Sequence, residues 1–104
     1  MLYALKEDYD RATVHYLKAT RLQPHNIDIK KGLGDFYCFS LGRIKDAMEI
    51  YLEVLSVRPR DTEILLVIGN ICTALDRFDD AKTFYQIVLD IEPWNRDAKK
   101  GLAG

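Results

Sequence analysis

The segment Ala47–Pro59, AMEIYLEVLSVRP, is the strongest indicator of the fold, because two further versions of it occur along the chain. In each version an alanine is followed four residues later by a tyrosine and eight residues after that by a proline. Successive prolines lie 35 and 34 residues apart (59 − 24 and 93 − 59). Self-similarity at this period predicts a stack of units, each of which buries its apolar face against its neighbours. The three sets are Ala12, Tyr16 and Pro24; Ala47, Tyr51 and Pro59; and Ala81, Tyr85 and Pro93.

The residues before and within the central stretch predict a pair of helices. From Asn26 to Phe39 apolar side chains recur at steps of three and four residues, the spacing of one helix face. Ser40-Leu41-Gly42 interrupts this pattern, and glycine is common just beyond a helix end. A second helix is expected over 43–56 and ends before Pro59, which lacks a backbone donor. One unit is therefore a helix, a tight turn, a second helix and a proline turn.

The next unit repeats this plan, with helices expected over 62–75 and 78–91. Its run Ile64–Ile68 is rich in β-branched residues and, taken alone, would suit a buried strand. We favour a helix, because the run is in register with the corresponding segment of the preceding unit. The region between the flanking turns is also too long for one strand. Asp61 or Thr62 is expected to accept hydrogen bonds from the free amides at the helix start.

Partial units are expected at both ends of the chain. Residues 1–6 resemble the end of a first helix, and a second helix is expected over 9–22. The segment 95–102, NRDAKKGL, echoes 26–33, NIDIKKGL. We expect a piece of a longer array; the alternative is a short natural protein whose open ends pair with other copies. The predicted organisation is a single domain, 1–104, with about seven helices, divided into a partial repeat 1–26, repeats 27–61 and 62–95, and the start of a further helix at 96–104.

This pattern resembles the tetratricopeptide repeat, in which helical hairpins stack into a right-handed superhelix. Leu33-Gly34 and Tyr37 precede the central alanine, tyrosine and proline in the order of the family signature, and Ile68-Gly69 precedes the next set. The resemblance covers essentially the whole chain. Small signature residues are expected where two helices of a hairpin cross, and tyrosines between successive hairpins. The signature positions are Ala12, Tyr16, Pro24, Gly34, Tyr37, Ala47, Tyr51, Pro59, Gly69, Ala81, Tyr85 and Pro93.

The chain departs from the family signature in a few positions. Lys30 and Leu65 stand where the signature has tryptophan, and Cys72 stands where a tyrosine is usual. In the middle unit Tyr37 lies ten residues before Ala47, whereas in the next unit Cys72 lies nine residues before Ala81. We therefore predict a longer or distorted turn around 40–42.

The composition indicates a folded protein of nearly balanced charge. Apolar residues make up 48% of the chain and charged residues 30%, with a formal net charge of −1 and a pI near 6.1. Nucleic acid and anionic membranes favour a concentrated basic surface, so neither is expected as the main partner. The strongest apolar run, Ile64–Ile68, is far shorter than a membrane span of about 20 residues. No secretory leader is expected, and a cytoplasmic location is predicted, because two cysteines make no disulfide framework.

The resemblance implies that the first helices of the hairpins line a concave groove. A surface that mixes apolar and charged groups in such a groove suits an extended peptide or a partner helix. Phe39, Leu66 and Val67 are expected as apolar anchors. Some family members bind a C-terminal carboxylate through lysine, asparagine and arginine, but Asp35 and Val67 replace the asparagines here. We therefore predict no carboxylate clamp, although Lys31 matches its first lysine. The expected partner-binding residues are Lys31, Asp35, Phe39, Leu66, Val67, Asn70, Thr73 and Lys100.

The remaining reactive side chains are expected to have structural roles. Cys38 and Cys72 lack the close spacing of a zinc or redox pair and are expected to pack. His15 and His25 lack a third ligand nearby, so no metal is expected. Trp94 is expected to cover the end of the preceding hairpin, with a binding anchor as the alternative.

The predicted function is a protein–protein interaction scaffold with no catalysis, cofactor or metal. Carboxylate pairs at helix starts suit the helix dipole, and no nucleophile has a recognisable catalytic setting. Two alternatives remain. The chain could be a self-association module that forms a homo-oligomer through its end hairpins, or the substrate-docking arm of a larger enzyme.

Overall fold

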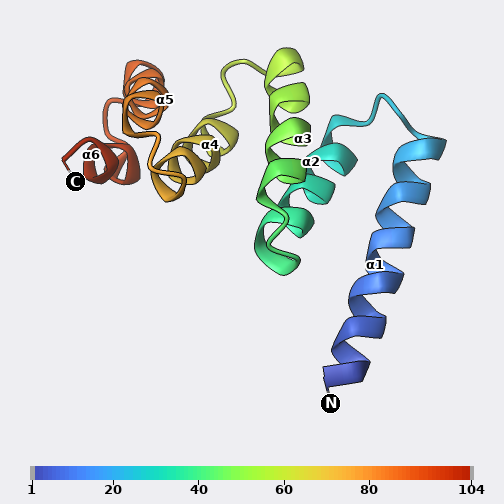
Figure 1. Ribbon diagram of the computed structural model, residues 1–104. Helices are drawn as coiled ribbons and strands as arrows, with labels where there is room; N and C mark the ends of the chain where they lie inside the picture. Colours follow the sequence, from blue (N-terminus) through green and yellow to red (C-terminus); the bar gives the residue numbers. More distant parts are fainter. Residues whose placement is uncertain (1, 104) are drawn as a thin grey trace. The chain divides into compact units, whose positions relative to one another are not determined.

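The computed structural model describes residues 2–103, with side chains from residue 8 onward, and over that range the regular elements are all helical (Figure 1). The all-α class is confirmed, and the run Ile64–Ile68 is helical rather than a strand. Two compact units are present, Met1–Val54 and Leu55–Gly104, and each is described by itself. In chain order the elements are α1 (Leu2–Leu22), α2 (Ile27–Asp35), the π-helical turn η1 (Phe36–Ser40), α3 (Ile44–Val57), α4 (Thr62–Ala74), α5 (Phe78–Ile91) and α6 (Arg96–Ala103).

The N-terminal segment differs from the prediction. Separate helices were expected over 1–6 and 9–22, but Leu2–Leu22 is one continuous helix, and Met1 lies outside the described residues. No glycine or proline occurs between residues 1 and 22, so nothing in this segment interrupts the backbone ladder. Over residues 2–103 there are therefore six α-helices where about seven were expected.

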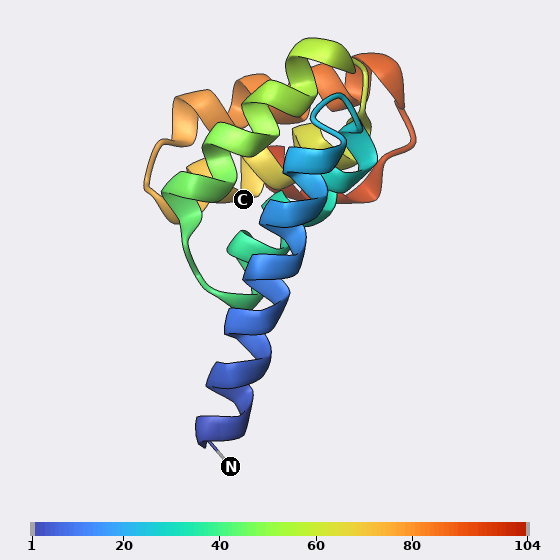
Figure 2. The ribbon, with the colours of Figure 1, turned by 90° about the vertical axis from the view of Figure 1, so that its right-hand side faces the viewer.

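In the first unit, α1 runs beside α2 in the opposite direction (Figure 1, Figure 2). Aromatic rings join α1 to η1, which continues α2, since the ring centroids of Tyr16 and Phe36 lie 5.4 Å apart. The second helix of the complete hairpin, α3, places the buried Tyr51 ring against Gly34, where an added Cβ would come within 2.8 Å of the ring. The signature residues therefore occupy the close helix crossing that the sequence predicts.

In the second unit, α4 and α5 form a hairpin, and α6 packs against α5. Tyr85 is buried between Gly69 of its own hairpin and Gly101 of α6, and a Cβ on either glycine would clash with its ring. The tyrosine thus fills the space between one hairpin and the next helix, as expected. The buried core of this unit consists of Ile64, Leu65, Ile68, Ile71, Cys72, Ala81, Tyr85, Val88 and Ala98.

Each first helix begins at an equivalent side-chain cap. Asn26 Oδ1 accepts from the Ile29 amide at 3.1 Å, and Asp61 Oδ1 accepts from the Ile64 amide at 3.2 Å. Asn95 caps α6 in the same way. These bonds satisfy amides that have no partner within the helix. Of the two residues expected to cap α4, Asp61 is the one that does so.

The extra residue of the middle unit is accommodated in η1. The Leu41 amide donates to the Phe36 carbonyl five residues earlier at 3.1 Å, whereas at the end of α4 the Leu75 amide reaches the Ile71 carbonyl, four residues earlier, at 3.0 Å. A π-helical turn holds one residue more than an α-helical turn. It therefore absorbs the insertion without breaking the helix.

The turns that follow η1 and α4 are alike. Each contains a residue in the left-handed region, Gly42 with φ 65° and Asp76 with φ 61°. In each turn the following amide donates to a carbonyl of the preceding helical segment. The Arg43 amide donates to the Tyr37 carbonyl and the Arg77 amide to the Cys72 carbonyl, both at 2.8 Å. The distortion therefore lies mainly within 36–40 rather than in the predicted turn at 40–42.

Candidate partner-binding surface

Two residues expected to contact a partner are engaged by core tyrosines. The Tyr51 hydroxyl donates to Asp35 Oδ1 at 2.7 Å, and the Tyr85 hydroxyl donates to Asn70 Oδ1 at 2.6 Å. Asp35 and Asn70 occupy equivalent positions on the first helices of successive hairpins. Thr73 Oγ1 lies 3.2 Å from the Tyr85 hydroxyl. These polar residues therefore hold the tyrosines, a role that sequence reasoning missed because the bonds cross between helices.

The environment of Tyr51 raises the pKa of its hydroxyl. Burial is the main cause, and the hydrogen bond to Asp35 and the charge of that carboxylate add to it. Burial also raises the pKa of Cys38, which outweighs the lowering effect of its hydrogen bond to Tyr51. The pKa of Cys72 is raised by burial as well. Both thiols therefore stay protonated at neutral pH and lack the thiolate that nucleophilic chemistry requires.

Phe39 is the most exposed of the apolar residues predicted to bind a partner. It lies in η1 with 71% of its surface exposed, whereas Tyr37 in the same turn is buried. In the same unit, Lys31 and Asp35 are half-buried on α2. Transfer of a large aromatic side chain from water into an apolar contact is favourable, so packing against a partner would lower the free energy of this ring. The first unit therefore presents an aromatic side chain next to polar groups.

The other five expected residues lie in the second unit. Leu66 and Val67 are half-buried on α4, while Asn70 and Thr73 are exposed farther along the same helix, and Lys100 is exposed on α6. Helices α4 and α6 are in contact. This unit therefore brings apolar, amide and cationic groups onto neighbouring helices.

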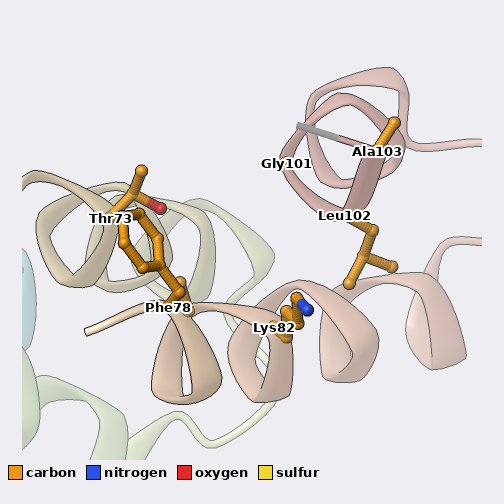
Figure 3. A pocket seen from close by; sticks show the side chains of 7 residues that line it. Thr73, Phe78, Lys82, Gly101, Leu102 and Ala103 are labelled. Carbon is orange, nitrogen blue, oxygen red and sulfur yellow. The ribbon is translucent and has the colours of Figure 1, made fainter. Parts of the chain in front are cut away.

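A pocket of about 440 Å³ opens beside this surface of the second unit (Figure 3). The end of α4, the start of α5 and the end of α6 supply its lining. Most lining atoms belong to apolar side chains, and Lys82 contributes a cation. A pocket of this size suits an apolar side chain or a small segment of a ligand. The lining residues are Thr73, Phe78, Ala81, Lys82, Gly101, Leu102 and Ala103.

Trp94 does not cover a hairpin end as expected, because 71% of its surface is exposed. Its place after Pro93, in the link between α5 and α6, leaves the indole without enough neighbouring side chains to bury it. Over residues 2–103, no set of three histidine, cysteine or acidic side chains is close enough to hold a metal ion. Within the same range, none of the helices has the length and apolar character needed to cross a membrane.

Repeated helical hairpins with a buried tyrosine against a small residue at each helix crossing define a helical-repeat protein. The tetratricopeptide repeat family matches residues 32–61 and 62–93, which together exceed half of the chain. The chain therefore belongs to the tetratricopeptide repeat family.

Known proteins similar to this chain are consistent with that assignment. The BBSome complex member BBS4 of Bos taurus is 31% identical over 87 residues, which cover 84% of this chain but only 17% of the bovine protein. The first repeat domain of Spaghetti (RPAP3), solved with the HSP90 peptide SRMEEVD, superposes with a TM-score of 0.79 at 26% identity and covers 97% of this chain and 79% of that one. A tetratricopeptide repeat protein from Parabacteroides merdae gives a TM-score of 0.85 at 22% identity, covering 94% of this chain and 38% of that one.

Proposed function

We propose that this chain is a protein-interaction module that binds a peptide or a partner helix through the exposed faces of its first helices. The exposed ring of Phe39 carries this proposal, because the π-helical turn presents it on the helix that in this family faces ligands. The similarity to a repeat domain solved with a bound peptide supports the same class of function.

The two units contribute different contacts in this proposal. In the first, Phe39 anchors an apolar side chain and Lys31 adds a polar contact. In the second, Leu66 and Val67 provide apolar area, and Lys100 provides a cation. Asn70 contributes through its amide nitrogen, because its oxygen already accepts from the Tyr85 hydroxyl. The pocket shown in Figure 3 accepts an apolar side chain of the ligand.

The ligand we propose does not depend on a terminal carboxylate. Asp35 is an anion where a clamp would use asparagine, and its carboxylate also holds Tyr51. An approaching carboxylate would meet like charge there. We therefore expect the peptide SRMEEVD to bind this chain at least about tenfold more weakly than it binds the RPAP3 domain, a difference of about 1.4 kcal/mol in binding free energy.

Binding of a captured partner tests the proposal. Immobilised protein is used to capture partners, the captured peptide region is synthesised, and its affinity is measured by calorimetry. Phe39→Ala and Leu66→Ala should each weaken binding about fivefold or more, as expected for truncated apolar anchors. The matched control is Val57→Ala with Ile87→Ala, which truncates exposed apolar residues on the second helices. If the control weakens binding as much as the two test variants, or the test variants leave it unchanged, the surface assignment is wrong.

We assign no catalytic step to this module, and family membership is the support for that assignment. We also propose that it acts in a reducing compartment such as the cytoplasm. The observation that supports this is that both Cys38 and Cys72 are free thiols.

A further inference from the structure

The outer face of α1 carries an exposed stripe that is unlike its counterparts in the other repeats. Val14 and Leu17 are 64% and 46% exposed, and with Lys18 and Arg21 they line a shallow pocket of about 310 Å³. From residue 11 to residue 27 the chain has three basic residues and no acidic one. The stripe is therefore apolar and basic in a chain whose net charge is −1.

The exposure of this stripe follows from its position within the repeat. The repeat offsets of 35 and 69 residues map the α1 stripe onto α3 and α5, at positions that are also exposed in these complete hairpins. These positions therefore face solvent in all three helices. The α1 stripe differs from the α3 and α5 stripes in residue type and not in solvent exposure. The stripe residues Val14, Leu17, Lys18 and Arg21 correspond to Glu49, Leu52, Glu53 and Ser56 of α3 and to Thr83, Gln86, Ile87 and Asp90 of α5.

The α3 stripe complements the α1 stripe at two positions that lie seven residues, about two turns, apart on one line of each helix. Asp10, one turn before Val14 on α1, corresponds to Lys45. Leu17 corresponds to Leu52, which is 48% exposed. One pair of opposite charges therefore lies about two turns from a matched pair of leucines, whereas on α5 Gln86 takes the place of the leucine and Asp79 takes the place of the lysine.

We propose that a second copy of this chain docks on α1, with the α3 stripe of one copy packed parallel to the α1 stripe of the other. Leu17 then contacts Leu52 of the second copy, and Asp10 faces its Lys45. The contact is small, so we expect weak association with a Kd of about 10 µM to 1 mM.

This inference is independent of the peptide-binding surface proposed above, because it uses the outer faces of α1 and α3. Sedimentation velocity on the 104-residue chain from about 10 µM to about 1 mM should show a weight-average mass that rises above the 12.0 kDa monomer with concentration. The association should weaken between about 0.05 M and about 0.5 M salt, because exposed charge pairs are screened.

A charge swap tests the register of the two stripes. Asp10→Lys places like charges opposite Lys45, and Lys45→Asp does so opposite Asp10, so each should weaken association by about threefold to tenfold. The double variant carries both changes, keeps the net charge of the chain and should restore association to within about twofold of the wild type. Circular dichroism on each variant shows whether the helices are retained.

Three outcomes overturn the proposal. The chain could remain a monomer at every concentration, or it could associate with no response to the single reversals. The double variant could also stay as weak as the single ones, which would exclude the parallel pairing. Sedimentation with vesicles of anionic phospholipid provides a further arm, since a chain that stays monomeric and binds vesicles through Lys18 and Arg21 would make the stripe a membrane contact instead.

Discussion

Replacing Gly69 with alanine tests whether close approach to Tyr85 limits the second hairpin. The new Cβ would lie 2.7 Å from Cε1, 3.0 Å from Cδ1 and 3.2 Å from Cζ of the ring. The ring cannot withdraw easily, because it is buried, its hydroxyl is bonded to Asn70, and Gly101 of α6 lies against its other side.

Two effects of opposite sign decide the result of this substitution. Alanine is about 1 kcal/mol better than glycine inside a helix. Overpacking a core costs about 1–3 kcal/mol, and the trapped ring of Tyr85 places this site at the upper end of that range. We therefore expect Gly69→Ala to lower the free energy of unfolding by about 2 kcal/mol, with a fall in Tm of about 8–15 °C.

Gly32→Ala is the matched control. Its Cβ would lie 3.3 Å from Cε1 of Tyr16, which is only half-buried and can move aside. We expect Gly32→Ala to be neutral or to stabilise the chain by up to about 1 kcal/mol. Denaturant unfolding followed by far-UV circular dichroism measures both variants against the wild type.

A double-mutant cycle identifies the cause of the loss. In a Tyr85→Leu background the ring is absent, so Gly69→Ala should cost much less than in the wild type. The reasoning is refuted if Gly69→Ala stabilises the wild-type chain, or if it costs the same free energy with and without the ring.

Two further predictions follow from the middle hairpin. The raised pKa of Tyr51 means that its proton is held more tightly in the folded state, so its contribution to stability is complete below its unfolded pKa of about 10 and is lost as pH rises above that value. The fall in unfolding free energy above about pH 10 should therefore be smaller in Tyr51→Phe than in the wild type, measured by denaturant unfolding across alkaline pH; equal slopes would contradict the assignment. Deleting Ser40 should let the π-helical turn become α-helical with little loss of stability, whereas deleting Ala74 from the regular α4 should shorten its turn and destabilise the second hairpin. Thermal unfolding of the two deletions compares them, and equal losses would mean that η1 does not absorb the extra residue.

Most of the helical architecture could be predicted from local sequence patterns. The spacing of apolar residues, the proline turns and the caps at Asn26 and Asp61 act over a few residues, and their effects do not depend on distant contacts. The 34- and 35-residue periods then indicated stacking, because each unit needs a neighbour to bury its apolar face. The expected limits of α5, 78–91, agree with the structure for this reason.

The candidate surface was less predictable, because it depends on contacts between helices. The sequence placed Asp35 and Asn70 on the face of the first helices, but only the packing of the hairpins shows that each one accepts a hydrogen bond from a buried tyrosine. Register alone could not reveal this, since the bonded residues are 16 and 15 positions apart. The exposure of Trp94 likewise depends on which side chains surround it in space.

The amino-acid sequence alone was enough to show that this chain is built from repeated helical hairpins, because the period, the helix caps and the helix breakers are local or repetitive signals. Only the packed structure shows where the extra residue of the middle unit is accommodated, and therefore how Phe39 is exposed. Either a longer turn or a π-helical turn can absorb one residue. The choice follows from keeping Tyr37 buried and the following turn unchanged, which is a property of the packed hairpin rather than of any short segment.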